Sequence, residues 1–148
     1  MIQRKQSLFL LLTFLIAISM LFIPFSKYFH DNQEEYLDLM PTKPADFIRD
    51  NIYFPIILNF SAILLSLLSI FKYKKRILQY KLVNLLVLLN VLITGLLFLL
   101  SYVKDGTIGE IHFSIGAFFP IISIFSAFFA AHYIKKDEQL VRNSDRIR

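Results

Sequence analysis

The stretch from residue 82 to residue 103 reads LVNLLVLLNVLITGLLFLLSYV. It contains 22 residues and no charged side chain. An α-helix rises about 1.5 Å per residue and the hydrocarbon core of a bilayer is about 30 Å thick, so a helix of this length can cross it. A helix also satisfies its own backbone hydrogen bonds in lipid. The stretch therefore predicts a transmembrane helix.

Three more runs without Asp, Glu, Lys or Arg flank this one, and each of the four has 20 to 24 residues. Of the 148 residues in the chain, 56% are apolar and only 18% are charged, against about 25% charged residues in a soluble domain. We therefore expect one transmembrane domain over residues 1–148. Its expected parts are spans at 7–26, 52–71, 82–103 and 111–134, an outer loop at 27–51 and a tail at 135–148.

The first run could also be a secretion signal, because Arg4 and Lys5 precede it. Its apolar stretch exceeds the 7 to 15 residues of such a signal, and Pro24 lies near its far end. These features favour an uncleaved first helix.

Basic residues indicate the orientation of the spans. Twelve of the sixteen Lys and Arg residues fall in the N-terminus, the connection between spans two and three, and the tail. Lys and Arg collect on the cytoplasmic side of membrane proteins. Short connections after spans two and three also make neighbouring helices antiparallel. We therefore expect an all-α integral membrane four-helix bundle, up-down-up-down, with both termini in the cytoplasm.

The outer loop carries six acidic and three basic residues. Its last part, Pro44 to Arg49, predicts a turn of interfacial helix that leads into span two. A solvated acidic loop is one interpretation of this segment, and a docking site for a basic partner is the other.

Small and polar side chains recur in each span at alternating spacings of four and three residues. This spacing keeps one helix face toward a neighbour, and membrane helices associate through small residues and side-chain hydrogen bonds. Asn59, Asn84 and Asn90 are the best candidates for such bonds. The expected helix-packing residues are Thr13, Ala17, Asn59, Ala62, Ser66, Asn90, Thr94, Gly95, Gly116, Pro120, Ser123 and Ala127. An alternative is a polar path for a substrate, lined by Asn59, Ser66, Asn90 and Ser123.

The sequence offers little reactive chemistry. There is no Cys, no ionisable side chain lies near the centre of a span, and no phosphate-binding or nucleophile motif occurs. His112 beside Glu110, and His132 beside Lys135, are more typical of interfacial residues than of metal ligands. We expect no catalytic residues, no metal and no cofactor, and we expect a protein that is not an enzyme.

The tail from Lys135 to Arg148 can extend the last helix, because Glu138 and Arg142 stand four residues apart, as an ion pair on a helix requires. A basic collar at the membrane surface is one interpretation of the tail. The other is a docking peptide for a cytoplasmic partner. The candidate docking residues are Lys136, Asp137, Glu138, Leu140, Val141, Arg142, Asp145 and Arg146.

The two ends of the chain carry a resemblance to a known family. The start Met1-Ile2-Gln3-Arg4 and the ending Lys136 to Arg148 resemble the Bacteroidota membrane family catalogued as domain of unknown function 4293, and Gly116 to Pro120 matches its fourth helix. Asn143-Ser144 and Ile147 depart slightly from the family's ending. The resemblance implies four spans in the inner membrane of a Gram-negative bacterium and supplies no activity.

These observations favour a non-enzymatic structural or accessory subunit that acts through helix packing and contacts with a membrane-protein complex. Its expected partners are membrane lipids and a protein that binds the tail; the basic residues flank apolar spans, so nucleic acid is not expected. The alternative is a small transporter or channel subunit for a neutral or lipid-like substrate. A membrane enzyme built around His112 and Glu110 is a more distant alternative.

Overall fold

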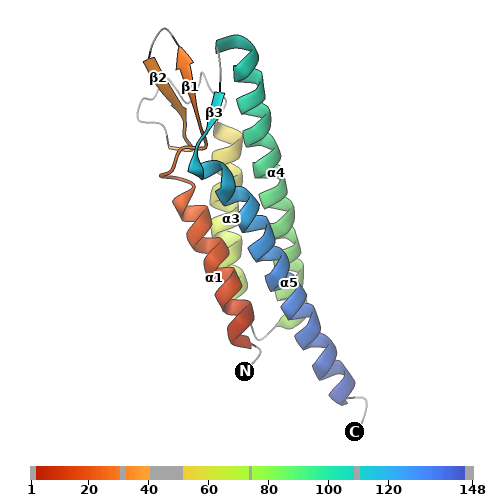
Figure 1. The fold of residues 1–148 in the computed structure, drawn as a ribbon. Helices are drawn as coiled ribbons and strands as arrows, with labels where there is room; N and C mark the ends of the chain where they lie inside the picture. Colours follow the sequence, from red (N-terminus) through yellow and green to blue (C-terminus); the bar gives the residue numbers. More distant parts are fainter. Residues whose placement is uncertain (1–2, 31–32, 41–51, 74, 109–110, 146–148) are drawn as a thin grey trace.

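The fold is seen in a computed structural model that describes residues 3–30, 33–40, 52–73, 75–108 and 111–145. Figure 1 shows long helices lying side by side, with short strands gathered at one end. We call that end the sheet end, and the opposite end, where α1 begins and α5 ends, the basal end. The helices are α1 (Gln3–Ser19), α3 (Tyr53–Phe71), α4 (Arg76–Ile108) and α5 (Phe118–Asp145). The short elements are β1 (Ser26–His30), β2 (Gln33–Leu37), β3 (Ile111–Phe113) and the 3-10 turn η1 (Ile115–Ala117).

Each helix packs against two others. α1 contacts α5 and α3, and α4 contacts the same two helices, so the contacts form a closed ring. We call this ring of four helices the helix layer, and successive helices within it run in opposite directions (Figure 1). This arrangement encloses one interior that runs the length of the helices.

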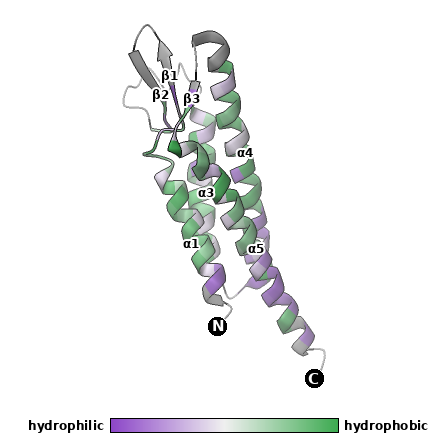
Figure 2. Cartoon of the chain, in the orientation of Figure 1, coloured by the Kyte–Doolittle hydropathy of each residue, from purple (hydrophilic) through white to green (hydrophobic). Residues whose placement is uncertain are grey.

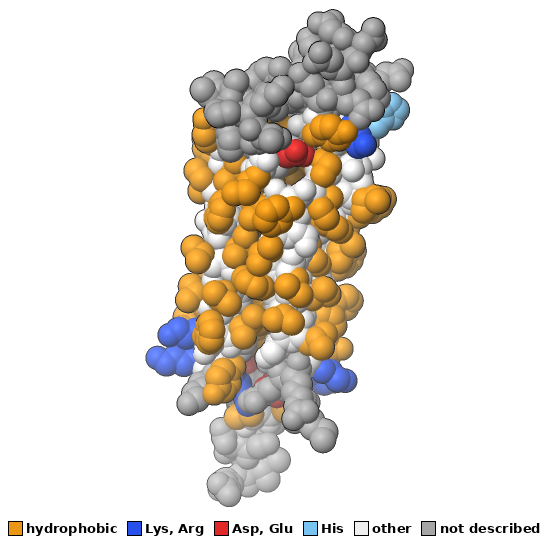
Figure 3. All heavy atoms as spheres, turned by 90° about the vertical axis from the view of Figure 1, so that its left-hand side faces the viewer, with side chains coloured by type: hydrophobic (Ala, Val, Ile, Leu, Met, Phe, Trp, Pro, Cys, Tyr) orange, Lys and Arg blue, Asp and Glu red, His pale blue; other side chains and the backbone are white. Residues whose placement is uncertain are grey.

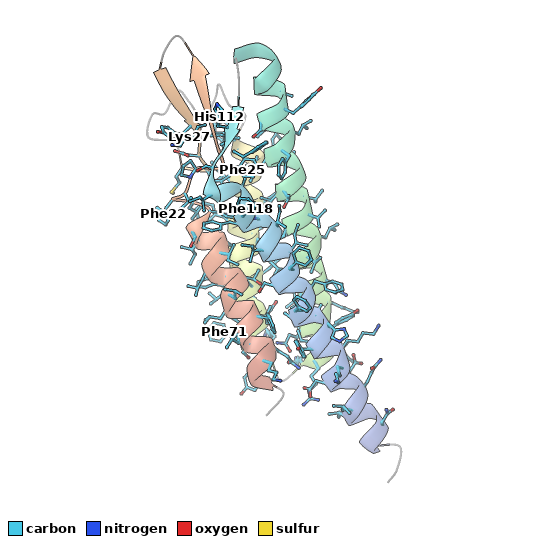
Figure 4. All side chains as sticks on the ribbon, viewed as in Figure 1. Phe22, Phe25, Lys27, Phe71, His112 and Phe118 are labelled. Atoms are coloured by element: carbon cyan, nitrogen blue, oxygen red, sulfur yellow. The ribbon has the colours of Figure 1, made fainter. Side chains whose placement is uncertain are left out.

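The interior combines small and polar side chains with buried apolar ones such as Leu10, Leu86 and Ile93, and further large apolar side chains cover the outside. Ser66 and Ser123 are fully buried, whereas Phe54 and Phe71 are 72% and 69% exposed. Figure 4 shows Phe22 and Phe71 directed outward from the helices. So many exposed large apolar side chains are not typical of a water-soluble domain, which keeps most of these residues in its core.

Hydrophobic residues occupy the middle of the helices, and hydrophilic residues gather at the basal ends of α1 and α5 (Figure 2). On the face seen in Figure 3, hydrophobic side chains cover the middle and the described charged side chains lie near the two ends. Among the described residues, three helical segments are long and apolar enough to cross a membrane: Tyr53–Phe71, Arg76–Val103 and Ile115–Val141. The apolar helix Lys5–Ser19 is shorter.

The fold is mostly helical, as predicted, but it is not all-α, because three short strands in the described part of the chain form a sheet at the sheet end. β1 pairs in antiparallel fashion with β2 and with β3, in the order β2-β1-β3. In this register Lys27 lies opposite Tyr36 on one side and His112 on the other. Aromatic residues in β1 and β2 favour their pairing. Asp31-Asn32, between these two strands in the sequence, is a turn signal that could have predicted the hairpin. Within the outer loop, the helix expected at 44–49 lies outside the described residues.

Several helix boundaries also differ from the expected spans. α4 extends from Arg76 to Ile108, beyond both ends of the span expected at 82–103. α1 ends at Ser19, and Pro24, which lacks a backbone N–H, prevents helical turns from continuing past Ile23. Helix-like turns still continue to Ile23, whose N–H bonds to the Ser19 carbonyl at 3.1 Å. α5 begins at Phe118 and not at residue 111, because Ile111–Phe113 is held in the sheet as β3.

Gly116 in η1 lies against the turn that follows α1. A Cβ on Gly116 would lie 2.2 Å from the Pro24 carbonyl oxygen and 3.1 Å from that of Ile23. Both are backbone atoms, so they cannot move aside as a side chain would. Glycine is therefore required where the start of the last helix meets the end of the first.

We expect Gly116→Ala to lower the free energy of unfolding by about 1–3 kcal/mol, because the added methyl group overpacks this contact. Gly95→Ala is the matched control. Gly95 is exposed on α4 with no atom within 4 Å of its Cβ position, so alanine should leave stability unchanged or raise it by up to about 1 kcal/mol. Thermal unfolding in detergent would compare the two variants, and equal losses would contradict this account of Gly116.

Candidate functional site

The interior of the helix layer carries the polar groups that the sequence analysis singled out, and Asn90 lies at their centre. Its amide nitrogen donates to the Leu86 carbonyl at 2.8 Å, and its amide oxygen accepts from the Ser123 hydroxyl at 2.7 Å. Thr94 Oγ1 donates to the Asn90 backbone carbonyl at 2.7 Å. Asn90 therefore joins two turns of α4 to α5.

The other three helix interfaces also contain hydrogen bonds. Asn59 Nδ2 on α3 donates to the Ala17 carbonyl of α1 at 3.0 Å, and Gln79 Nε2 on α4 donates to the Ser69 carbonyl of α3 at 3.0 Å. Between α1 and α5, Gln6 Nε2 donates to the Tyr133 carbonyl and Ser126 Oγ to the Phe9 carbonyl. Gln79 and Ser126 were not predicted, although buried Gln79 falls on the four-and-three spacing that includes Asn90.

The predicted packing residues divide into three groups by exposure. Thr94 is half-buried and Gly95 is exposed. Asn84, expected to bond between helices, is exposed on α4 instead. Gly95 and Asn84 lie off the buried face of α4. The residues of that face follow the spacing that joins Asn90 to Leu97 and Ser101. The remaining residues are buried: Thr13, Ala17, Asn59, Ala62, Ser66, Asn90, Gly116, Pro120, Ser123 and Ala127.

The four residues proposed to line a polar path are each no more than 2% exposed. Asn59, Asn90 and Ser123 bond to other helices or across turns, and Ser66 Oγ donates to the Ile63 carbonyl at 2.8 Å. These donors are used within the protein. This arrangement favours packing over a hydrated path at these residues.

An ion pair closes the basal end of the helix layer. Arg76, at the start of α4, lies 3.3 Å from Asp137 Oδ2 on α5 and donates to the Asp137 backbone carbonyl at 3.2 Å. The Asp137 side chain is only 12% exposed. Asp137, predicted to contact a partner, is therefore held inside the chain, and Arg76 was not predicted at all.

Beyond Asp137, α5 continues to Asp145 and projects past the start of α1 (Figure 1). In that projecting part Leu140 and Val141 are exposed and Glu138 is half-buried. Lys136, just before Asp137, is also exposed. The side chains of Arg142 and Asp145, and all of Arg146, lie outside the description. The helical extension predicted for the tail is therefore observed as far as Asp145.

An aromatic cluster fastens the sheet to α4. Phe25 makes an edge-on contact with Phe98 at a centroid distance of 5.1 Å, and both rings contact Phe113 of β3. Beside them, the Ser26 and Ser101 hydroxyls are 3.2 Å apart and hydrogen-bonded. Figure 4 shows Phe25 where the sheet meets the helices.

Charged groups at the sheet end lie outside this cluster. Lys27 Nζ lies 5.1 Å from the centre of the Tyr36 ring, as in a cation–π contact. Asp38 Oδ1 is buried without a hydrogen-bond partner, and burial raises the pKa of the Asp38 carboxyl. His112 is exposed in β3, whereas Glu110 lies outside the described residues. No group of three or more His, Asp or Glu suited to hold a metal occurs in the described part of the chain.

We expect Asn90→Leu to lower the free energy of unfolding by about 1–3 kcal/mol, because it leaves the buried Ser123 hydroxyl without its acceptor. Asn84→Leu makes the same change on the same helix at an exposed position, so it should cost nothing. Unfolding in mixed detergent micelles with increasing dodecyl sulfate would measure both. A loss as large for Asn84→Leu would show that the interior bond has no special role.

Comparison with known proteins places the chain in a family without assigning an activity. No curated protein and no solved structure matches it. A family model described as "Domain of unknown function (DUF4293)" matches residues 2–147, nearly the whole chain. The resemblance seen at the two ends is thus confirmed over the full length, and the protein belongs to the DUF4293 family.

Proposed function

We propose that the protein is a multi-pass protein of the bacterial inner membrane, a four-helix bundle whose four helices all cross the bilayer with both termini in the cytoplasm. Three helices meet the length and hydropathy that a span requires. α1 and its following turns reach from Gln3 to Ile23, which at 1.5 Å per residue also covers about 30 Å. The basal end would face the cytoplasm, since Lys5, Lys75 and Lys135 are exposed there.

Within that membrane, we propose a non-enzymatic structural or accessory role in a larger complex. The observation that carries this proposal is the hydrogen-bonded interior. Its hydroxyl and amide groups donate to backbone carbonyls or, for Ser123, to the side-chain oxygen of Asn90, and in the described part of the chain no base stands beside these hydroxyls to activate them. Because these polar groups are used to hold the helices together, we assign contacts with partners to the outer surfaces of the protein.

The projecting part of α5 is the surface we assign to a cytoplasmic protein partner. Leu140 and Val141 are 47% and 43% exposed, beyond the level at which Arg76 and Asp137 close the helix layer. Apolar side chains on a helix that extends into water are typical of helix-in-groove recognition. Glu138 and Lys136 on the same helix would add charge recognition at the rim of such a contact.

The orientation can be tested with single cysteines, because the chain has none of its own. We expect a membrane-impermeant maleimide to label Met40→Cys in intact spheroplasts and Asn143→Cys only after lysis. Leu92→Cys, in the middle of α4, should resist labelling in both conditions. Labelling of positions 40 and 143 from the same side would contradict the proposed topology.

The docking role can be tested without disturbing the ion pair at Asp137. We expect Leu140→Asp combined with Val141→Asp to abolish copurification of the partner from native membranes, because two charges would enter an apolar contact. Gln139→Asp combined with Asn143→Asp adds the same charge at exposed polar positions and should retain the partner. Quantitative mass spectrometry of the purified material provides the measurement. A protein that purifies alone, or equal recovery from both variants, would count against this role.

A further inference from the structure

A groove runs along the outer surface of the helix layer between α4 and α5. Its volume is about 490 Å³, within the range of about 300–1,000 Å³ that ligand pockets occupy. Leu88 and Val91 of α4 and Phe128 of α5 form its apolar part. Asn84, His132 and Lys135 form its polar part. A second hollow of about 460 Å³ shares His132 and Lys135 and adds Lys136 to its lining.

The two parts of the groove lie at different depths. The Arg76 and Asp137 ion pair fixes the basal end of the two helices, and the Asn90 and Ser123 bond fixes their middle. Lys135 therefore lies near the basal end, and Val91 lies near the middle of the helix layer. From Tyr80 to Val91 the groove follows three turns of α4, about 16 Å, which is close to half the 30 Å thickness of a hydrocarbon core.

The polar part of the groove carries positive charge and an unused amide. Lys135 and Lys136 are exposed, and none of the described residues that line either hollow is Asp or Glu. Asn84 is exposed, and in the described part of the chain no hydrogen bond to its side chain occurs. An amide facing hydrocarbon without a partner is costly, so a ligand with acceptor oxygens at this depth would stabilise it.

The walls favour a flexible chain over another helix. Helices that pack closely in membranes meet at Gly, Ala, Ser and Thr. Here Leu88, Val91 and Phe128 line the apolar part, and Ala131 is the one small residue named among the described lining residues. A groove with bulky walls suits an acyl chain, which bends to fit between side chains.

We propose that this groove binds one anionic phospholipid of the cytoplasmic leaflet. Its phosphate lies at His132 and Lys135, its glycerol esters accept from Asn84, and one acyl chain follows Leu88, Val91 and Phe128 toward the middle of the membrane. Lys and Arg at the cytoplasmic surface attract anionic lipids, and the absence of acidic side chains from the described lining gives the site its charge preference. The inference rests on the membrane orientation proposed above.

Native mass spectrometry of the full chain, delipidated in mild detergent, would test the charge preference. Dioleoyl phosphatidylglycerol and dioleoyl phosphatidylcholine are the probes, since they differ only in the headgroup. We expect one phosphatidylglycerol to bind with about tenfold preference, and Lys135→Gln to reduce that preference at least fivefold. Lys75→Gln removes the same charge at an exposed position outside the groove and should change the preference less than twofold.

Two further pairs of variants test the position of the lipid. Val91→Trp should fill the groove and reduce binding of both lipids, whereas Leu92→Trp on the neighbouring exposed surface should not. Asn84→Leu should weaken phosphatidylglycerol binding without lowering stability. Equal binding of the two lipids, or equal effects of Lys135→Gln and Lys75→Gln, would overturn the proposal. If cysteine labelling shows the expected orientation and lipid selectivity is still absent, this inference alone fails.

Discussion

The requirement that every polar group inside the helix layer be bonded within the chain governs this structure. Packed side chains supply no water, so an unpaired donor there would be destabilising. The chain meets this requirement with long amides and short hydroxyls that reach backbone carbonyls of neighbouring helices, such as Asn59 to Ala17 and Ser126 to Phe9. Because these bonds occur at all four interfaces of the ring, they fix the register of each helix against its neighbours.

Small side chains make these bonds possible because they let the backbones approach. Ala17 and Ala62 are buried on α1 and α3 near Asn59, and Ala127 and Ala130 are buried on α5. Aromatic rings pack between α1 and α5, where the Phe9 ring stacks on Tyr133 at a centroid distance of 5.6 Å and contacts Phe129 at 5.7 Å. Close contact at small residues and hydrogen bonds to carbonyls are thus parts of the same packing solution.

Much of this interior could be predicted from the sequence, because spacing alone identifies a helix face. The prediction failed where residue type was given more weight than spacing. Asn84 and Gly95 were chosen as polar and small, yet they lie off the series that joins Asn90 to Leu97 and Ser101. Conversely, Asp137 continues the series of Ala127, Ala130 and Ile134 on α5, so its burial could have been predicted by extending the spacing past the apolar span.

The sheet end was less predictable because its structure depends on contacts between distant parts of the chain. β3 follows α4 and pairs with β1, which follows α1. Only this pairing, together with the contact between Phe25 and Phe113, distinguishes the strand from the start of an apolar helix. A run such as Ile111 to Phe113 is equally apolar in either conformation. Local hydropathy could not distinguish the two, whereas Gly116 against Pro24 shows how tightly the final arrangement is constrained.

An interior organised in this way restricts where function can lie. The described donors of Asn90, Asn59 and Ser123 are used in packing, so a ligand that competed for them would have to break the bonds that hold the helices together. Selective contacts are less costly on the outside, where Asn84 and Lys135 border the groove between α4 and α5, and at the projecting end of α5. Both surfaces include residues of α5, because Lys135 borders the groove and Leu140 and Val141 lie on the projecting end. The proposed lipid and the proposed partner would therefore contact the same helix within about two turns of each other.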